Sequence, residues 1–510
     1  MNRFYVTTPI YYINAEPHIG HFYTTLIADV IARFHRRRGD ETWFITGTDE
    51  HGDKIANAAA AAGRDPAAHA EYVSRIFQET WAACGIALDG FIRTTNPAHE
   101  RIVQGFLAQL HAAGDIYFGS YSGLYCTECE RLYTEKELVN GKCPDHLIAP
   151  TRISEDNYFF RMSKYQARLI AMLEARPEMI VPQQYRNEVL AMLRGEALGD
   201  LCISRPKARL TWGIELPFDP AYVTYVWFDA LLSYVSVLKI RGEETFERFW
   251  PAVHHIIGKD ILKPHGIFWP TMLMALGLPV YQQLHVHGYW TRGESKMSKS
   301  LGNVIRPLDM KARYGMDAFR YFLLREMAFG QDASFSEDAF ITRVNADLAN
   351  NLGNLISRTL SMQQRYFEGA VQPLGEPTAD DRALIAAFDT AAHELSAFTE
   401  RMAFHRALEA LWRAIDHANK YIVTTAPFTL AKDPARRPRV GSILHHLLEV
   451  LRVSAALLAP FLPETSAQIW SALGLDGDAI SGGAWGTNFA PGRQTGKPVI
   501  LFPRIEPDTT

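Results

Sequence analysis

Short apolar runs alternate with amphipathic stretches near the start of the chain. RFYVTTPI (3–10) has the length and β-branched content of a buried strand, and TWFIT (42–46) is a second such run. Between them, apolar side chains recur at helical spacing on one face of a helix that ends at Gly39: Ile27, Val30, Ile31 and Phe34. Another helical stretch lies near 69–84. Strand and helix in alternation predict a parallel sheet.

The same alternation returns later in the chain. Short apolar runs at 224–236, 254–260 and 283–290 are separated by helical segments. The sequence between the two halves, roughly 116–215, has a different texture and looks like an insertion into the sheet. The sequences before and after this insertion therefore belong to one α/β domain.

Long amphipathic segments replace the β-rich runs from about residue 330. One stripe at spacing i, i+3, i+4 and i+7 consists of Leu408, Leu411, Trp412 and Ile415. This part of the chain is predicted to be an all-helical bundle.

Length and composition are those of an ordinary globular protein. For 510 residues we expect about two to four domains, and 47% hydrophobic with 21% charged residues excludes a disordered chain. The formal net charge is −4, so a polyanion must be held by local basic patches. No signal peptide is visible, and no apolar run approaches the ~20 residues that span a bilayer. We therefore expect a soluble cytoplasmic protein with no membrane partner.

Three of the five cysteines cluster with a histidine at metal-ligand spacing. CTEC supplies Cys126 and Cys129, CPDH supplies Cys143 and His146, and 13 residues separate the two pairs. Four such ligands complete the tetrahedral shell of a structural Zn²⁺ and leave no position open for water. Coincidental spacing is the alternative, and it is the weaker one.

Two short motifs far apart in the sequence carry residues suited to phosphate. PHIGH places His18 and His21 at the turn from the first strand into the first helix, where N–H groups and the helix dipole favour an anion. GESKMSKSLGN (293–303) places Lys296 and Lys299 on a loop with glycines at both ends. Taken singly, the histidines are also compatible with residues that only begin a helix, or with a pair of metal ligands. The lysines are likewise compatible with a solvated surface loop, although a loop closing over a polyphosphate is the sharper interpretation.

The two motifs in this order resemble the paired signatures of class I aminoacyl-tRNA synthetases. The surrounding sequence is similar to the methionyl-tRNA synthetases, from FYVTTPIYYINAEPHIGH through TGTDEHG, TYVWFDALLSY and IGKDILKPHGIFWP to GESKMSKSLGN. The resemblance implies a bacterial-type methionine–tRNA ligase with a single zinc knuckle that uses ATP with Mg²⁺. In this family the histidines and the lysines bind ATP from opposite sides, and catalysis rests on positioning and electrostatics.

The resemblance also assigns the parts of an α/β fold. It implies a Rossmann-like parallel-sheet catalytic domain (1–115 and 216–290) and a connective insertion with the zinc knuckle (116–215). A region with the lysine loop and stem contacts (291–345) leads to an α-helical anticodon-binding domain (346–510). Some family members carry a further dimerisation domain, for which the chain has no room after VILFPRIEPDTT, so we expect a monomer.

The methionine pocket follows from the resemblance residue by residue. It comprises Ile10, Tyr12, Trp227, Ala230, Leu231, Tyr234, Ile261, His265 and Trp269. Aromatic faces and small apolar groups suit a polarisable thioether. Judged without the resemblance, the three large aromatic side chains are also compatible with plain core residues, and His265 with a satisfied core histidine.

The polar ends of the substrates are assigned in the same way. Asp49 matches the carboxylate that binds the α-ammonium group, although capping of the next helix is its alternative role. Gly258 and Asp260 match positions that pack on the nucleoside, with Asp260 on the ribose hydroxyls, and Trp290 offers backbone atoms to adenine. With Lys299 these residues complete the predicted ATP site, at carboxyl ends of strands, where open α/β sheets bind ligands.

Three residues of the helical part are expected to contact the anticodon. Asn354 and Arg358 lie one helical turn apart and match the residues that hydrogen-bond anticodon bases. Their alternative is an ordinary polar helix face. Phe428 stands where the family usually has a stacking tryptophan, so its smaller ring is expected to stack more weakly.

Two other functions share some of these features. A nucleotidyltransferase of the same superfold has similar histidines but does not bind tRNA, and the helical part and the zinc insertion argue against it. A catalytically dead RNA-binding paralogue is disfavoured because His18, His21, Lys296 and Lys299 are all present.

Overall fold

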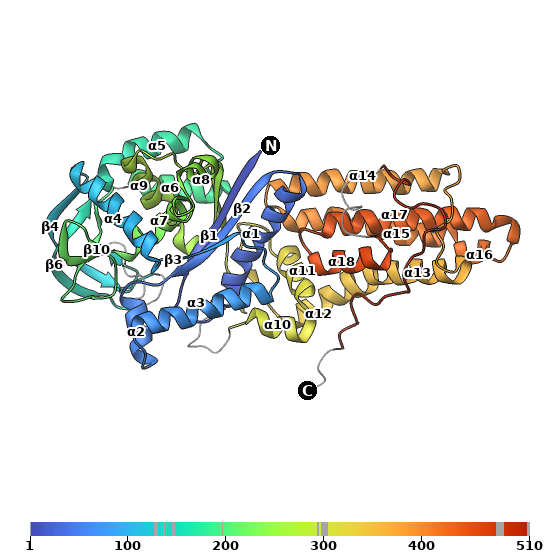
Figure 1. Ribbon diagram of the computed structural model, residues 1–510, viewed down its shortest axis with the longest axis horizontal. Helices are drawn as coiled ribbons and strands as arrows, with labels where there is room; N and C mark the ends of the chain where they lie inside the picture. Colours follow the sequence, from blue (N-terminus) through green and yellow to red (C-terminus); the bar gives the residue numbers. More distant parts are fainter. Residues whose placement is uncertain are drawn as a thin grey trace. The chain divides into compact units, whose positions relative to one another are not determined.

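The computed structural model divides into two compact units (Figure 1). The sheet unit is Met1–Tyr289 with Arg306–Leu308, and the helical unit is Trp290–Ile305 with Asp309–Thr510. The structure describes residues 2–126, 131–133, 135, 138–144, 148–195, 197–292, 295–296, 304–475 and 484–506.

A six-stranded parallel sheet in the order β3-β2-β1-β12-β13-β7 is the centre of the sheet unit. Its strands are β1 (Arg3–Tyr12), β2 (Glu41–Asp49), β3 (Gly90–Arg93), β7 (Ile180–Val181), β12 (Val253–Gly258) and β13 (Gln283–His287). β2 follows β1 in the chain, whereas β12, its other neighbour, comes much later, so the strand order reverses between β1 and β12. The crevice at the carboxyl ends of two such strands is where open α/β sheets bind ligands.

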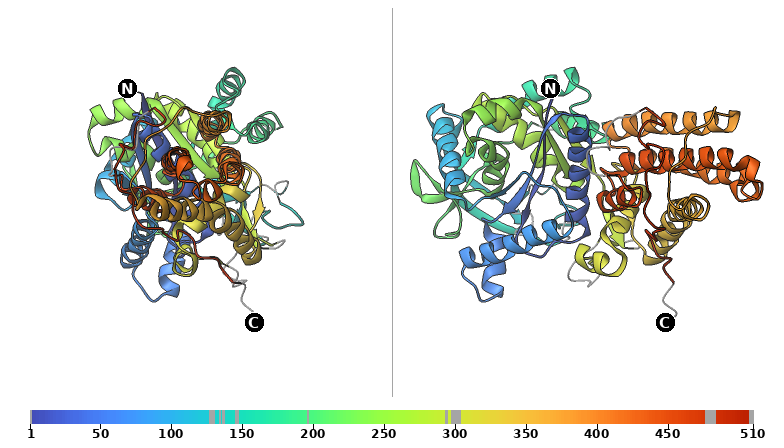
Figure 2. Two further views of the ribbon diagram at one scale, coloured as in Figure 1. Left: turned by 90° about the vertical axis from the view of Figure 1, so that its right-hand side faces the viewer. Right: turned by 45° about the vertical axis from the view of Figure 1, so that its right-hand side comes forward.

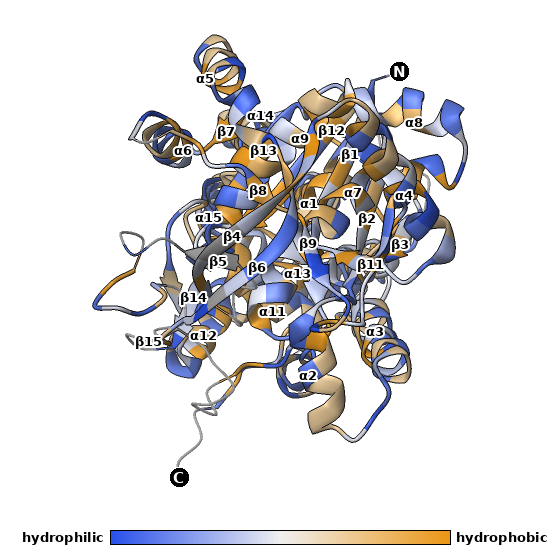
Figure 3. Cartoon of the chain, turned by 90° about the vertical axis from the view of Figure 1, so that its left-hand side faces the viewer, coloured by the Kyte–Doolittle hydropathy of each residue, from blue (hydrophilic) through white to orange (hydrophobic). Residues whose placement is uncertain are grey.

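Helices cover both faces of this sheet, so its strands are buried almost throughout (Figure 1). The helices of this unit are α1 (Ile19–Arg37), α2 (Asp53–Ala61), α3 (Pro66–Ala83), α4 (Pro97–Ala112), α5 (Gln166–Ala175), α6 (Gln183–Gly195), α7 (Val226–Lys239), α8 (Glu243–Phe249) and α9 (Trp269–Leu276). α5 and α6 carry hydrophobic and hydrophilic residues together, as helices with one buried face do (Figure 3).

Two smaller antiparallel sheets belong to the same unit. One has the order β5-β4-β6-β8 and the other the order β10-β11-β9. Their bounds are β4 (Ile116–Cys126), β5 (Arg131–Tyr133), β6 (Thr151–Phe160), β8 (Leu201–Cys202), β9 (Ser204–Pro206), β10 (Glu215–Leu216) and β11 (Asp219–Thr224). The predicted insertion, 116–215, contains most of these strands and also β7, which pairs with β13 at the edge of the central sheet. Its boundaries stay a prediction.

The described part of the helical unit has three short strands, β14 (Trp290–Arg292) and β15 (Ser295–Lys296) at its start and β16 (Ala333–Ser334) after α11. Its helices are α10 (Pro307–Tyr314), α11 (Met316–Glu326), α12 (Glu337–Arg343), α13 (Asn354–Phe367), α14 (Ala379–Glu400), α15 (Phe404–Thr425), α16 (Pro427–Leu430), α17 (Arg437–Leu458) and α18 (Pro463–Ala472). α14, α15 and α17 run side by side and pack on one another (Figures 1 and 2). One helix, Pro434–Leu458, is apolar and long enough to cross a membrane, but 83% of its most apolar window is buried within the fold.

The predicted fold class, a parallel-sheet α/β domain followed by a helical bundle, is confirmed. The predicted strands 3–10 and 42–46 are β1 and β2, and the helix near 69–84 is α3. The predicted stripe on α15 is buried, with Leu408, Leu411 and Ile415 all fully covered.

Candidate active site

Two histidines begin α1 directly after β1. His18 is the N-cap, and its Nδ1 accepts the N–H of Gly20 at 3.0 Å, while Nδ1 of His21 accepts the N–H of His18 at 3.3 Å. The two rings stack with centroids 3.8 Å apart. Since Nδ1 is the acceptor in both rings, Nε2 carries the proton of each neutral imidazole. The helix start therefore offers two ring N–H donors beside the positive end of the helix dipole.

Gly20 is required between the two histidines. A Cβ at this position would lie 2.9 Å from Cε1 of His18, so any other residue displaces the capping ring.

The carboxyl end of β12 has a second such glycine. A Cβ on Gly258 would lie 2.6 Å from Oδ1 of Asp260, in the turn that follows the strand. Gly258 is paired in register with His287, whose Nε2 lies 2.7 Å from the hydroxyl of Thr24 in α1. This bond ties the helix that carries the histidine pair to β13. Trp290, which was predicted to contact adenine, belongs to the helical unit. It is buried there, and its ring centroid lies 5.8 Å from that of Phe322.

The aromatic residues predicted for methionine lie together around His265. Tyr234 Oη is 2.8 Å from Nε2 of His265, and Nδ1 of His265 is 3.0 Å from the carbonyl of Ile261. The carbonyl accepts only, so Nδ1–H donates to it, and Nε2 accepts the hydroxyl hydrogen of Tyr234. Trp227 stands edge-on to His265 at 6.1 Å, and Tyr12 edge-on to Trp227 at 6.4 Å.

Apolar surroundings keep this histidine neutral. Burial lowers the pKa of His265 to about 4. The predicted pocket residues Ile10, Ala230, Leu231 and Trp269 are buried in one hydrophobic core, and Ile261 is partly buried against it. The arrangement presents an uncharged, mostly apolar surface, which suits a thioether.

Trp269 is completely buried, and its indole N–H donates to Nε2 of His255 at 3.1 Å. His255 in turn lies 2.7 Å from the hydroxyl of Thr7 on β1. No pattern in the sequence pointed to His255, because it lies inside the mostly apolar run of β12.

Asp49 is the last residue of β2 and is buried, in register with Tyr12 of β1. Burial, followed by the charges of Tyr11 and Asp49, raises the pKa of Tyr234.

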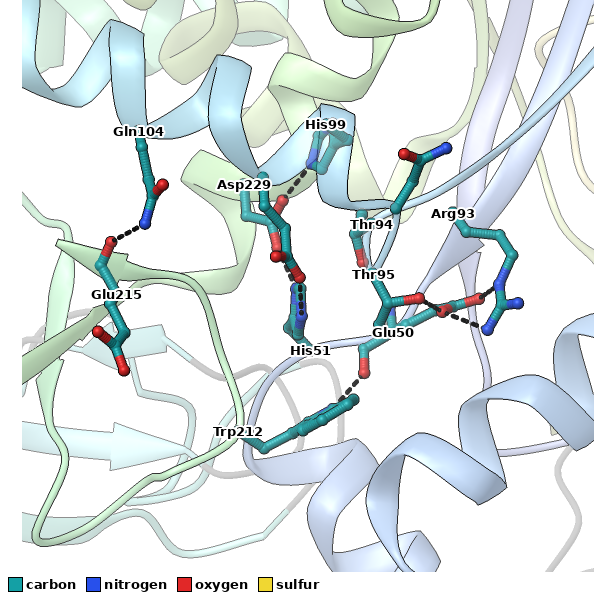
Figure 4. Close-up of polar contacts among 12 residues, drawn as sticks. Glu50, His51, Arg93, Thr94, Thr95, His99, Gln104, Trp212, Glu215 and Asp229 are labelled. Carbon is teal, nitrogen blue, oxygen red and sulfur yellow. Dashed lines mark hydrogen bonds and ion pairs between the residues drawn. The ribbon is translucent and has the colours of Figure 1, made fainter. Parts of the chain in front are cut away.

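A polar network around Glu50, the residue that follows Asp49 in the chain, was not predicted (Figure 4). Glu50 is fully buried and accepts bonds from Arg93, at 2.8 and 3.0 Å, and from the hydroxyls of Thr48 and Thr95. The indole N–H of Trp212 donates to its carbonyl at 2.5 Å. The only sequence signal for this network is the acidic pair within GTDEHG.

The second unpredicted network joins three elements (Figure 4). Asp229 of α7 is fully buried, and its two carboxylate oxygens lie 2.6 Å from Nδ1 of His51 and 2.6 Å from Nε2 of His99. A lone aspartate in TYVWFDALLSY was the available signal, because a charge inside an apolar run requires partners.

One of the two lysines and half of the zinc motif lie outside the described residues. Lys299, Cys129 and His146 are among them, and only the backbone of Lys296 is described, in β15. Cys126 and Cys143 are both described, fully buried, and form one cluster. Within the described part of the chain, no three His, Cys, Asp or Glu side chains are grouped as metal ligands.

The predicted anticodon residues Asn354 and Arg358 line a hollow on the helical unit, together with Ala346, Asn350, Asn351, Asp416, Asn419, Lys420 and Val423. Sequence reasoning missed the neighbouring amides, of which Asn351 donates to Asp416 at 2.6 Å and accepts from Asn419 at 2.7 Å. Phe428 is not part of this lining, but its ring is 48% exposed on α16, as a stacking residue must be.

Known proteins match the chain along its length. The family described as "tRNA synthetases class I (M)" matches residues 4–152 and 146–360, and "Anticodon binding domain of methionyl tRNA ligase" matches 371–510. The methionine–tRNA ligase of Caldanaerobacter subterraneus subsp. tengcongensis is 43% identical, covering 99% of this chain and 79% of that protein. That of Deinococcus radiodurans is 45% identical, covering 99% of this chain and 75% of that protein.

A solved structure agrees with these sequence matches. Mycobacterium tuberculosis methionyl-tRNA synthetase in complex with methionyl-adenylate superposes with a TM-score of 0.95 at 41% identity, covering 99% of this chain and 100% of that one.

Two observations define a class I aminoacyl-tRNA synthetase. The strand order of the sheet reverses beside a helix that is capped by a histidine, and the class I synthetase family model matches the chain up to residue 360. The anticodon-binding match and the full-length relatives decide which one. The chain belongs to the methionyl-tRNA synthetase family, the methionine–tRNA ligases. The predicted family and enzyme class are confirmed.

Proposed function

We propose that the chain joins L-methionine to the 3′ end of methionine tRNAs, for initiation and elongation of translation, in two steps at the carboxyl edge of the central sheet. In the first step the methionine carboxylate attacks the α-phosphorus of ATP, the bond to the bridging oxygen breaks, and pyrophosphate leaves. In the second step a terminal ribose hydroxyl of the tRNA attacks the adenylate carbonyl, and AMP leaves. The observation that carries this proposal is the stacked pair His18–His21, which follows directly on the strand that contributes Ile10 and Tyr12 to the aromatic pocket.

The histidine pair stabilises the phosphates of ATP. The Nε2–H groups of His18 and His21 donate to phosphate oxygens at the start of α1, where the dipole favours negative charge. Lys296 and Lys299 approach the phosphates from the other side and stabilise the departing pyrophosphate. Fixed donors of this kind act without a covalent nucleophile, because they stabilise charge that develops as the P–O bond breaks.

The methionine side chain occupies the aromatic pocket. Its thioether contacts Tyr234, His265 and Trp227, whose neutral and largely apolar surface does not satisfy polar side chains. Asp49, at the end of β2, binds the α-ammonium group. Trp269 supports the pocket from within the core through its bond to His255.

The nucleoside lies over the end of β12. Gly258 lets the backbone approach it closely, and Asp260 binds the ribose hydroxyls, with backbone atoms of Trp290 on adenine. ATP enters with Mg²⁺, which neutralises phosphate charge.

A structural Zn²⁺ is held by Cys126, Cys129, Cys143 and His146. The two described thiols support this assignment, because both are fully buried in a small cluster of their own. Thiolates are strong zinc ligands, and a buried pair at the end of a strand is half of a tetrahedral site.

The helical unit selects the tRNA. Asn354 and Arg358, both exposed at the hollow, hydrogen-bond the edges of anticodon bases, and Phe428 stacks on one of them. The proposal includes the domain boundaries that were predicted from the sequence. It also includes a cytoplasmic location and a monomeric state.

Adenylate formation followed by discharge tests the two steps separately. The purified chain is incubated with methionine, ATP, Mg²⁺ and pyrophosphatase, and the bound product is identified by mass spectrometry. We expect bound methionyl-adenylate, its disappearance when methionine tRNA is added, and none when methionine is omitted. No adenylate in the complete mixture contradicts the first step, and an adenylate that survives added tRNA contradicts the second.

A further inference from the structure

The carboxylate of Asp229 connects α7 to two other elements of the sheet unit (Figure 4). Its Oδ2 is 2.6 Å from Nδ1 of His51, which follows β2, and its Oδ1 is 2.6 Å from Nε2 of His99 in α4. A carboxylate only accepts, so each imidazole donates an N–H to it. One buried side chain thus fixes the position of three chain segments.

Two of these segments carry proposed methionine ligands. His51 lies two residues after Asp49, the proposed partner of the ammonium group, on the same buried turn. Asp229 lies within one helical turn of Trp227, Ala230 and Leu231, which line the proposed thioether pocket. The bond between His51 and Asp229 is therefore a direct link between the parts that hold the two ends of methionine.

The remaining contacts of the network hold it in one arrangement. Nδ1 of His99 is 2.6 Å from the hydroxyl of Ser236, about two turns after Asp229 in α7. The ring of His51 packs 5.4 Å from that of Trp212, and its Nε2 is 3.9 Å from a carboxylate oxygen of Glu100.

Charge favours the paired state over either partner alone. Burial opposes protonation of His51, but the charge and hydrogen bond of Asp229, with Glu100 and Glu50, raise its pKa. Burial likewise opposes ionisation of Asp229, but His51 and His99 lower its pKa. A buried ion pair is weak evidence for stability, since apolar residues often replace one without loss, and geometric specificity is its better-attested use.

We propose that Asp229 is a positioning residue for methionine, which sets the distance between Asp49 and the thioether pocket through His51. The proposal rests on the proposed function, since it assumes that Asp49 and Trp227 bind methionine. It predicts that loss of the carboxylate weakens methionine binding selectively, because none of the three segments joined by Asp229 contains a proposed ATP ligand.

The experiment is ATP–pyrophosphate exchange with Asp229→Asn, in which an isosteric amide cannot accept from both imidazoles. We expect the KM for methionine to rise about tenfold or more, with the KM for ATP and kcat within about threefold of the original chain. Asp29→Asn is the matched control. Asp29 is equally buried in the same unit and is bonded to Arg33 at 2.8 Å and to the N–H of Ala87 at 2.9 Å. We expect it to lower the melting temperature without changing the KM for methionine.

A pair of variants at His51 gives an independent measurement if Asp229→Asn does not fold. Asn has an N–H close to the position of the imidazole Nδ1–H, so His51→Asn should keep most methionine affinity while His51→Ala loses it. An unchanged KM for methionine in folded Asp229→Asn, or equal increases in both KM values, overturns the proposal. So does equal methionine affinity of His51→Asn and His51→Ala. An original chain that shows no methionine-dependent exchange overturns the proposed function itself, and the positioning role with it.

Discussion

His18 caps α1 through Nδ1 and at the same time stacks on His21, with the two ring centroids 3.8 Å apart. The structural role of His18 and its proposed role in phosphate binding therefore fall on one side chain. Alanine substitution alone does not separate them, because it removes the cap and the imidazole together.

Asparagine at position 18 separates the two roles. Asn is among the best N-cap residues, whereas alanine at an N-cap costs ~0.5–2 kcal/mol of stability. We expect His18→Asn to melt close to the original chain and His18→Ala to melt lower. Both variants should form adenylate about a hundredfold more slowly or worse, with near-normal methionine affinity. Original turnover in His18→Asn, measured by single-turnover adenylate formation, contradicts phosphate binding by this ring.

Acid should destabilise the sheet unit through His265. Its pKa is about 4 in the folded chain against an ordinary value of 6.5. Below pH 6.5 the unfolded chain therefore binds a proton that the folded chain does not, and stability falls as the pH is lowered towards 4. Between pH 6.5 and 5 this costs about 1.5–2 kcal/mol.

Glutamine at position 265 removes the titration while keeping one donor and one acceptor. The free energy of unfolding of each protein is measured in urea at pH 6.5 and pH 5. Between these two values the decrease for His265→Gln should be smaller than the decrease for the original chain, by about 1.5–2 kcal/mol. Parallel curves for the two proteins contradict a neutral buried His265.

Zinc content tests the knuckle directly. Cys126→Ser and Cys143→Ser should each lose the metal, because a tetrahedral thiolate site tolerates no missing ligand. Cys84→Ser is the control, since Cys84 is also buried but lies after α3, outside the motif. Elemental analysis should find about one zinc per chain in the original protein and the control. Equal zinc content in all four proteins, or none in the original chain, contradicts the assignment.

Base recognition should be separable from methionine activation. Arg358→Ala should lower tRNA charging about tenfold or more and leave ATP–pyrophosphate exchange unchanged, because a bidentate base contact is worth ~1–3 kcal/mol. Arg382→Ala, an exposed arginine of α14 outside the hollow, serves as the control and should charge normally. A matching loss in both variants indicates a general charge effect and contradicts specific recognition by Arg358.

Phe428 offers a gain-of-function test. A larger ring stacks more surface on a base, so Phe428→Trp should bind methionine tRNA more tightly and Phe428→Ala about tenfold more weakly. Equilibrium binding of tRNA measures both. Identical affinities for the three proteins contradict stacking at this position.

The sequence predicts what periodicity and position encode. β1 and β2 follow from short β-rich runs, and the place of His18 and His21 at a strand–helix turn follows from their position after the first run. A two-residue strand such as β7 has no pattern of its own, so its pairing with β13 appears only in the fold.

Buried polar networks escape sequence reasoning for a related reason. Asp229 meets His99 across 130 positions and His51 across 178, and no local pattern reports such partners. The role of His255 was not predicted, because the apolar residues of β12 mark the whole run as a buried strand. A charged or imidazole side chain inside an apolar run shows that partners exist, but only the fold shows which ones.

ATP–pyrophosphate exchange without tRNA, with each of the twenty amino acids in turn, is the most direct test of methionine activation by this chain. We predict exchange with methionine and not with the other nineteen, at a rate that His18→Asn lowers by orders of magnitude. Exchange with a different amino acid would contradict the assignment of the Tyr234–His265 pocket. Exchange with none would contradict the proposed first step altogether.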